Sequence, residues 1–124
     1  MINTFTNTLN RHIRKKPSND EYSINIYGIL SCNKKIDEKT ISYINDLKNN
    51  SNDEYKCHWI VNEDNEIVWD GSHSFKNYLV WLDFIIRLLV IEGHTLNGMF
   101  MVRRDDINYR TIIKIENNEI REMR

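Results

Sequence analysis

The sequence predicts an α+β fold in which two helices pack on one face of a mostly antiparallel sheet. Three observations support this prediction. Residues 22–32 and 57–70 are rich in the β-branched and aromatic residues that favour strands. Residues 75–97 contain one long apolar helix that ends at Gly93 and runs into a strand. The segments after it alternate again, so the predicted order is β-α-β-β-α-β-β-β, whose first six elements match a split βαβ layout.

The length of 124 residues fits one domain, which we assign to residues 21–124. Residues 1–20 are predicted to be a basic N-terminal arm or a short helix, because Arg11, Arg14, Lys15 and Lys16 lie close together before Pro17.

The charge balance argues against several classes of partner. With 17 basic and 18 acidic side chains, the net charge of −1 favours neither nucleic acid nor an anionic membrane. The longest apolar run, Leu79–Ile91, is interrupted by Asp83 and Arg87 and is shorter than the roughly 20 residues of a membrane helix. Residues 1–10 lack the apolar core of a signal peptide. We therefore expect a cytoplasmic protein with reduced cysteines.

The first half of the domain reads as a strand followed by a helix. Residues 22–32 form the strand, and Gly28 within it indicates a bulge or a close neighbour. Asp37 can cap an amphipathic helix in which Ile41, Ile44 and Leu47 recur at helical spacing. The polar residues 49–54 end this half.

The second half begins with a hairpin and the long helix. Residues 57–70 form the hairpin, with a turn at residues 63–65. The turn at residues 70–73 breaks the second strand, and Ser74 is the predicted N-cap of the helix. Gly93 is the predicted left-handed residue at its C-terminal end.

On a helical wheel the long helix is apolar over more of its circumference than a surface helix requires. One broad face holds Phe75, Tyr78, Leu82, Ile85, Ile86 and Leu89. A second group flanks a narrow polar stripe: Val80, Phe84, Val90 and Ile91. Either the sheet wraps this helix or a second subunit covers it, and we predict a homo-oligomer formed through these four residues.

The last third is predicted to be an antiparallel meander. Leu96, Phe100 and Val102 share one face of a strand, and the opposite face holds Asn97, Met99, Met101 and Arg103. In the next strand Tyr109, Thr111, Ile113 and Ile115 share a side. The Asn117-Asn118 pair then allows a tight turn.

No arrangement of residues is typical of a metal site, a cofactor site or a catalytic nucleophile. Cys32, Cys57, His58 and His73 could bind zinc, but CxxC and HxxxH spacings are missing. A Cys–His pair, with His73 or His94 as the base, lacks a supporting elbow motif. We predict no cofactor and no metal, and read the cysteines as small buried hydrophobic residues.

Two groups of residues are candidates for ligand binding. The arginines of the Arg103-Arg104-Asp105-Asp106 run could hold an anion, with help from backbone amides at the start of the long helix. The ends of that helix supply the rest of the predicted site. The predicted ligand-binding residues are Asp70, His73, His94, Asn97, Arg103 and Arg104.

From Cys57 onward the chain resembles a family of small proteins from bacteriophages and bacteria. The shared segments are CHW, IVWDG, FKNYLVWLDFIIRLL and HTLNG. The matching residues are Trp69, Asp70, Gly71, Phe75, Tyr78, Trp81, Leu82, Gly93, Leu96, Asn97 and Gly98. His94 departs from the pattern, where tyrosine is common, and residues 102–105 replace a Trp-Gln-Gly-Glu element. The resemblance implies an origin in a phage, a prophage or another mobile element, and it implies no particular activity.

Three functions remain open at this point. The first is a non-enzymatic binding protein, plausibly a viral factor in the host cytoplasm that sequesters a nucleotide-like ligand or inhibits a host defence protein. The second is a small hydrolase or nuclease that uses His58 or His73 with Asp70. The third is a structural subunit assembled through the long helix.

Overall fold

The computed structural model describes residues 23–49, 56–105 and 109–123. Its elements are β1 (Ile24–Cys32), α2 (Glu38–Asn45), the 3-10 turn η1 (Leu47–Asn49), β2 (Trp59–Val61), β3 (Glu66–Trp69), α3 (Tyr78–Ile91), β4 (Leu96–Arg104), β5 (Tyr109–Glu116) and β6 (Glu119–Met123). This is the predicted order of strands and helices. The predicted N-terminal arm or helix and most of the predicted polar loop at residues 49–54 lie outside the described residues.

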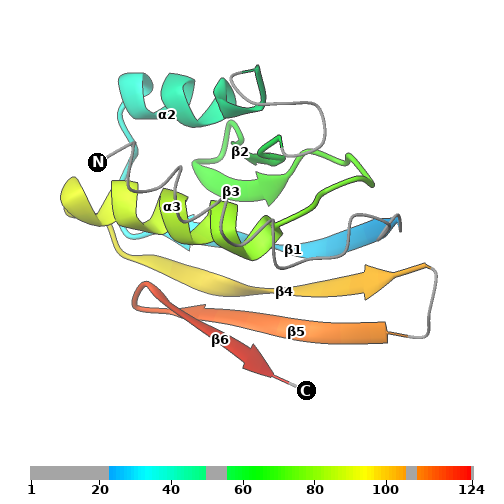
Figure 1. The fold of residues 1–124 in the computed structure, drawn as a ribbon. Coiled ribbons are helices and arrows are strands. Elements are labelled where there is room, and N and C mark those ends of the chain that lie inside the picture. The colour runs from blue at the N-terminus through cyan, green and yellow to red at the C-terminus, as the bar shows by residue number, and fades with distance from the viewer. Residues whose placement is uncertain (1–22, 50–55, 106–108, 124) are drawn as a thin grey trace.

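The six strands form one sheet in the order β2-β3-β1-β4-β5-β6, and every neighbouring pair is antiparallel (Figure 1). Because β1 lies between β3 and β4, the first six elements form the predicted split βαβ arrangement. The strands β5 and β6 extend it as a meander. Asn117 and Asn118, both with positive φ, make the tight turn between them, as the sequence predicts.

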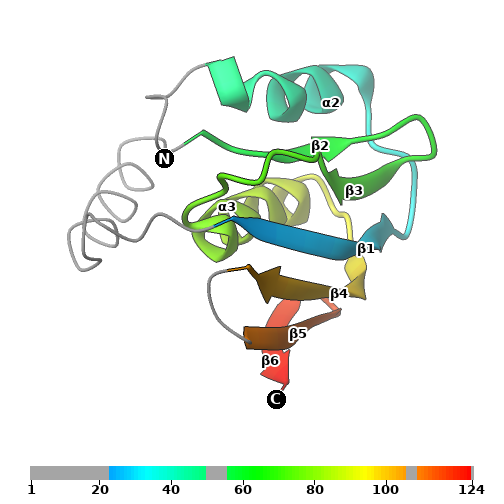
Figure 2. The ribbon, with the colours of Figure 1, turned by 90° about the vertical axis from the view of Figure 1, so that its right-hand side faces the viewer.

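Both helices cover the same face of the sheet, which confirms the predicted α+β fold. The helix α3 packs on the sheet and runs roughly along its strands, and α2 lies beside the edge strand β2 (Figures 1 and 2). The core between them includes Ile24, Leu30, Ile44, Trp59, Ile67, Leu82, Ile85, Leu89, Leu96, Phe100 and Ile113. Among the described helices, none is long and apolar enough to span a membrane.

The central strands β1 and β4 approach closely at two glycines. A Cβ atom on Gly28 would overlap the backbone oxygen of Met99, and one on Gly98 would overlap the backbone oxygen of Ile29. Both glycines have positive φ, which other residues rarely adopt. The sequence allows either a bulge or a close neighbour at Gly28, and the structure shows the close neighbour.

The helix α2 starts as its sequence indicates but ends at Asn45, so that Leu47 lies in η1, and it also closes part of an edge of the sheet. The side chain of Asp37 accepts a hydrogen bond from the Thr40 backbone N–H at 2.8 Å, so Asp37 is the predicted N-cap. The amide of Asn45 accepts from the Val61 N–H at 2.7 Å and donates to the Val61 carbonyl at 3.2 Å. One side chain thus pairs the free backbone groups at the outer edge of β2.

The start of α3 differs from the prediction. Its N-cap is Asn77, which has a φ of 61° and makes no capping bond with its side chain, so the predicted N-cap at Ser74 is wrong. The reason is a tertiary packing contact. Phe75 is buried, with its ring centroid 5.5 Å from that of Trp59, and this packing fixes a non-helical approach to the helix.

The C-terminal end of α3 agrees with the prediction. Gly93 has a φ of 83°, and its N–H donates to the carbonyl of Val90 while the N–H of His94 donates to that of Leu89. These two bonds satisfy carbonyls that the last turn leaves unpaired.

Part of the apolar flank of α3 is covered by α2. Phe84 is buried, and its ring centroid lies 6.5 Å from that of Tyr43 of α2. Val80 is half-buried against the core. Only Val90 and Ile91 of the four residues predicted to form an oligomer interface are exposed, so these four side chains do not form one accessible surface.

Candidate functional site

The six predicted ligand-binding residues lie at opposite ends of α3. Asp70 and His73 precede the helix, whereas His94 and Asn97 follow it. The helix has 14 residues and therefore spans roughly 21 Å at about 1.5 Å per residue. A single small-molecule site cannot use both groups.

At the first end, Asp70 pairs with His58. Nδ1 of His58 lies 2.8 Å from Oδ2 of Asp70, and the two side chains are 13% and 14% exposed. The other oxygen of Asp70 accepts from the Ser72 backbone N–H at 2.8 Å. The His58 ring meets the Phe75 ring edge-on, with centroids 5.1 Å apart. Both oxygens of the carboxylate are thus bonded within the chain.

His73 does not join this pair. Its Nδ1 lies 3.0 Å from the carbonyl oxygen of Ile24, and its own carbonyl accepts from the Ile24 N–H at 2.9 Å. The ring of Trp69 lies edge-on to it. These contacts fix the start of β1, so neighbouring residues of the turn do not converge as a catalytic triad would require.

The cysteines are free thiols, and Cys57 is poorly suited to nucleophilic chemistry. Cys57 is buried, and the loss of solvent raises its pKa to about 12. Cys32 is half-buried, and burial also raises its pKa. Because the thiolate is the reactive form, neither thiol is activated. Within the described residues, no group of three or more His, Cys, Asp or Glu side chains could hold a metal ion.

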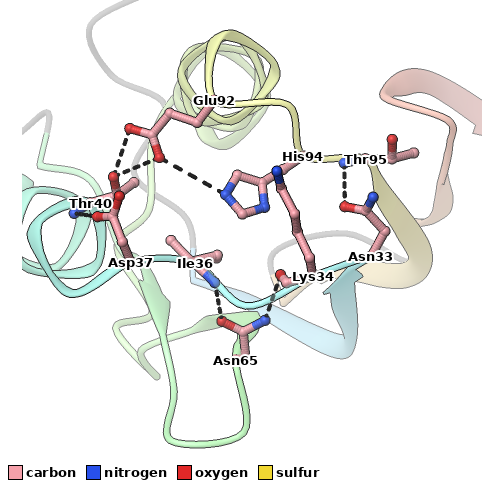
Figure 3. Close-up of polar contacts among 9 residues, drawn as sticks. All are labelled: Asn33, Lys34, Ile36, Asp37, Thr40, Asn65, Glu92, His94 and Thr95. Carbon is pink, nitrogen blue, oxygen red and sulfur yellow. Dashed lines mark hydrogen bonds and ion pairs between the residues drawn. The ribbon is translucent and has the colours of Figure 1, made fainter.

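At the second end, His94 is almost fully buried, with 4% of its surface exposed. Its Nδ1 has no hydrogen-bond partner, and its Nε2 lies 3.9 Å from Oε1 of Glu92 (Figure 3). The Glu92 carboxylate accepts from the Thr40 hydroxyl, at 2.8 Å and 2.7 Å to its two oxygens. This hydrogen bond joins the end of α3 to the first turn of α2.

Asparagine side chains fix the loops around His94. The amide of Asn65 accepts from the Ile36 N–H and donates to the Lys34 carbonyl, and Asn33 accepts from the Thr95 N–H at 2.8 Å (Figure 3). Asn97 accepts from the Asn117 N–H at 2.9 Å. The contact made by Asn97 thus holds the β5–β6 turn, which accounts for its position without a ligand.

The two predicted anion-binding arginines point to opposite faces of the sheet, because successive strand residues alternate. Arg104 shares the face of α3, and its guanidinium carbon lies 6.0 Å from the centroid of the Tyr109 ring. Arg103 is exposed on the other face, directly opposite Arg110. The two arginines therefore cannot bind one anion together. Asp106 of the predicted turn lies outside the described residues.

A surface that the site prediction missed is the sheet face opposite the helices, which we call the open face. No described helix covers it. Among the described residues, five of the seven exposed large hydrophobic side chains belong to this face: Tyr27, Ile29, Met99, Ile112 and Met123. The signal was present in the alternation of β4, where two methionines stand on the side away from the core.

Comparisons of the chain with protein-family models, with curated proteins and with solved structures give no match. The resemblance to phage and bacterial proteins therefore stays a prediction, and the geometry above has to support any function.

Proposed function

We propose that the protein is a non-enzymatic binding protein whose interaction surface is the open face of its sheet. The observation that carries this proposal is the concentration of exposed hydrophobic side chains on that face. Single exposed hydrophobic residues are ordinary, but a contiguous group on one face is typical of interaction sites.

The pairing of the strands makes these residues contiguous. Tyr27 lies opposite Met101, which lies opposite Ile112, and Ile112 lies opposite Met123. In the next row Ile29 lies opposite Met99. The apolar band thus crosses the four strands β1, β4, β5 and β6, and the row from Tyr27 to Met123 contains no charged residue.

The chemistry of this band favours a protein partner over a nucleotide. Tyr27 is the one aromatic side chain among the five exposed hydrophobic residues, and stacking on a base needs aromatic rings. Methionine and isoleucine instead adapt to the apolar side chains of another protein. The predicted origin in a phage or mobile element is consistent with a host protein, such as a defence protein, as this partner.

A photo-crosslinking amino acid at Tyr27 tests the proposal in the host cytoplasm. We expect a covalent adduct with a protein on illumination, because Tyr27 is half-exposed in the apolar band. The matched control carries the same amino acid at Lys39, which is exposed on α2 away from the open face, and should give no such adduct. If position 27 yields no protein adduct under these conditions, the open face is not an interaction surface.

The contact between His58 and Asp70 favours one second candidate, a small hydrolase or nuclease. A carboxylate bound to Nδ1 orients the ring and leaves Nε2 to take a proton from water. His58→Ala and Asp70→Asn variants, assayed against phosphodiester and ester substrates, test this function. Loss of an observed hydrolysis in both variants would support it, and activity unchanged in both would exclude it.

A further inference from the structure

We propose that the open face binds a second copy of this chain, in a symmetric dimer whose two sheets pack face to face. This inference rests on the proposed function, since it names the partner of the same surface. The order of charged and apolar rows on this face supports such a dimer.

The register of the strands places the open-face residues in four rows. The first row is Asn25, Arg103 and Arg110, the second is Tyr27, Met101, Ile112 and Met123, the third is Ile29, Met99, Lys114 and Arg121, and the fourth is Ser31, Asn97, Glu116 and Glu119. The face is therefore basic at one end of the strands and acidic at the other, and the two rows between them are apolar except for Lys114 and Arg121 in the third row.

This pattern is complementary to itself. On β5, Arg110 and Glu116 lie three residues before and three residues after Ile113. A two-fold axis parallel to the sheet and perpendicular to the strands, at the level of Ile113, exchanges the two ends. It places Arg110 of each copy over Glu116 of the other copy and lays the apolar rows on one another. The stems of Lys114 and Arg121 can cover Ile112 and Met123 of the second copy while their charged ends reach solvent.

Three charged side chains of this face lack partners among the described residues. In the described part of the protein, Arg103, Arg110 and Glu116 make no side-chain hydrogen bond or ion pair, whereas Glu119 lies 3.4 Å from Arg121. Arg103 and Arg110 stand directly opposite each other, and like charges in that position destabilise a sheet. A carboxylate from a partner would relieve this repulsion.

A second copy explains both charged ends, whereas other occupants explain one. An acidic protein or a nucleic acid would satisfy Arg103 and Arg110 but would bring negative charge against Glu116 and Glu119. The two-fold arrangement gives Arg110 of each copy a carboxylate partner, Glu116 of the other copy, so each charged end receives one opposite charge. Charge complementarity therefore selects this chain as its own partner.

The size of the face indicates a reversible dimer. With four strands about 4.8 Å apart and a rise of about 3.3 Å per residue, the face covered by these rows measures roughly 19 Å by 20 Å, or roughly 400 Å². This projected area is below the roughly 800 Å² of surface that each partner buries in a standard interface. We therefore expect the dimer to dissociate on dilution.

Pairing through the edge strands is a poorer route to a dimer. Asn45 already bonds both free backbone groups of Val61 at the edge of β2. The other edge, β6, carries Glu119, Arg121 and Glu122, and such charges discourage pairing with another strand.

Sedimentation equilibrium and native mass spectrometry of the full chain, from about 1 µM to about 1 mM, test the dimer. We expect the wild type to pass from monomer to dimer over this range. Arg110→Glu and Glu116→Arg should each raise the dissociation constant by about tenfold or more, because each sets like charges across the interface. The double variant R110E/E116R should return it to within about threefold of the wild type. Met99→Lys, at a half-exposed position in the apolar band, should abolish the dimer while circular dichroism shows an unchanged fold.

A Lys39→Glu variant is the control for a charge reversal away from the open face and should dimerise as the wild type does. A wild type that stays monomeric at every concentration overturns the inference, and so does a double variant no tighter than the single ones. If the chain is monomeric but the crosslinker at Tyr27 still captures another protein, the dimer fails and the proposed function stands. If the crosslinker captures nothing and the chain is monomeric, both fail.

Discussion

Nδ1 of His58 lies 2.8 Å from Oδ2 of Asp70 because the hairpin of β2 and β3 brings the two residues together. Trp59 pairs with Trp69 in the register of these strands, and the Asp70 N–H donates to the His58 carbonyl at 2.9 Å just beyond that pair. A contact fixed by both backbone and side chains is built into the fold, whether or not it carries chemistry.

Truncating Asp70 should cost more stability than neutralising it. Asp70→Ala leaves His58 and the Ser72 N–H without their acceptor in a mostly buried place, so we expect a loss of about 1–3 kcal/mol. Asp70→Asn keeps an acceptor oxygen, and its loss should be smaller. Urea unfolding measures both free energies. Equal losses in the two variants would show that the hydrogen bonds contribute little.

Adding a methyl group at Gly28 should severely destabilise the sheet. Gly28→Ala puts a Cβ atom into the backbone of β4 at Met99, and we expect a loss of roughly 3 kcal/mol or more. Gly71 is the matched control, because it also has positive φ but has no heavy atom within 4 Å of an added Cβ. Gly71→Ala should cost about 1 kcal/mol. Thermal unfolding compares the two, and similar losses would contradict the close approach of β1 and β4.

The N-cap of α2 should make stability depend on pH in the acidic range. The hydrogen bond from the Thr40 N–H lowers the pKa of Asp37 below its ordinary value of 3.8. The stabilisation is present above the unfolded pKa and is lost as the pH falls through the lowered folded pKa. Asp37→Asn keeps a capping acceptor but removes the titration.

The difference in unfolding free energy between wild type and Asp37→Asn should therefore shrink as the pH falls from roughly 5 to 2. Urea melts at each pH measure it. A difference that is constant over this range would mean that the Asp37 charge does not contribute to the cap.

The thiol of Cys57 should be unreactive in the native protein. With a pKa of about 12, only a trace is thiolate at pH 8, and the side chain is buried. Labelling with a chromogenic disulfide reagent, followed by mass spectrometry of the peptides, should modify Cys57 only after denaturation. Cys32, which is half-buried, serves as the internal comparison and should react faster. Rapid native labelling of Cys57 would contradict its burial.

Sequence reasoning succeeded where the cause is local. The cap at Asp37, the exit at Gly93 and the turn at Asn117 and Asn118 each depend on residues within a few positions of one another. The strand faces were also predictable, because alternation in a strand follows from its geometry. The start of α3 was not, because Phe75 packs against residues of β2 that are distant in sequence.

The sequence leaves the arrangement of the candidate residues open. The sequence offers two possible histidine partners for Asp70, His58 and His73. The register of β2 and β3 brings His58 to Asp70. Spacing in the sequence does not show whether all six residues can form one site. In the structure α3 separates the two groups, and Arg103 and Arg104 lie on opposite faces of the sheet.

By itself the sequence determined the α+β class, the order of the elements and which face of each strand is buried, since these follow from periodicity and turn residues. Only the tertiary structure decided that α2 covers Phe84, that Asn45 closes an edge, and that exposed hydrophobic residues from β1, β4, β5 and β6 form one face. Those relationships depend on which strands become neighbours, and neighbours in this sheet come from distant parts of the chain.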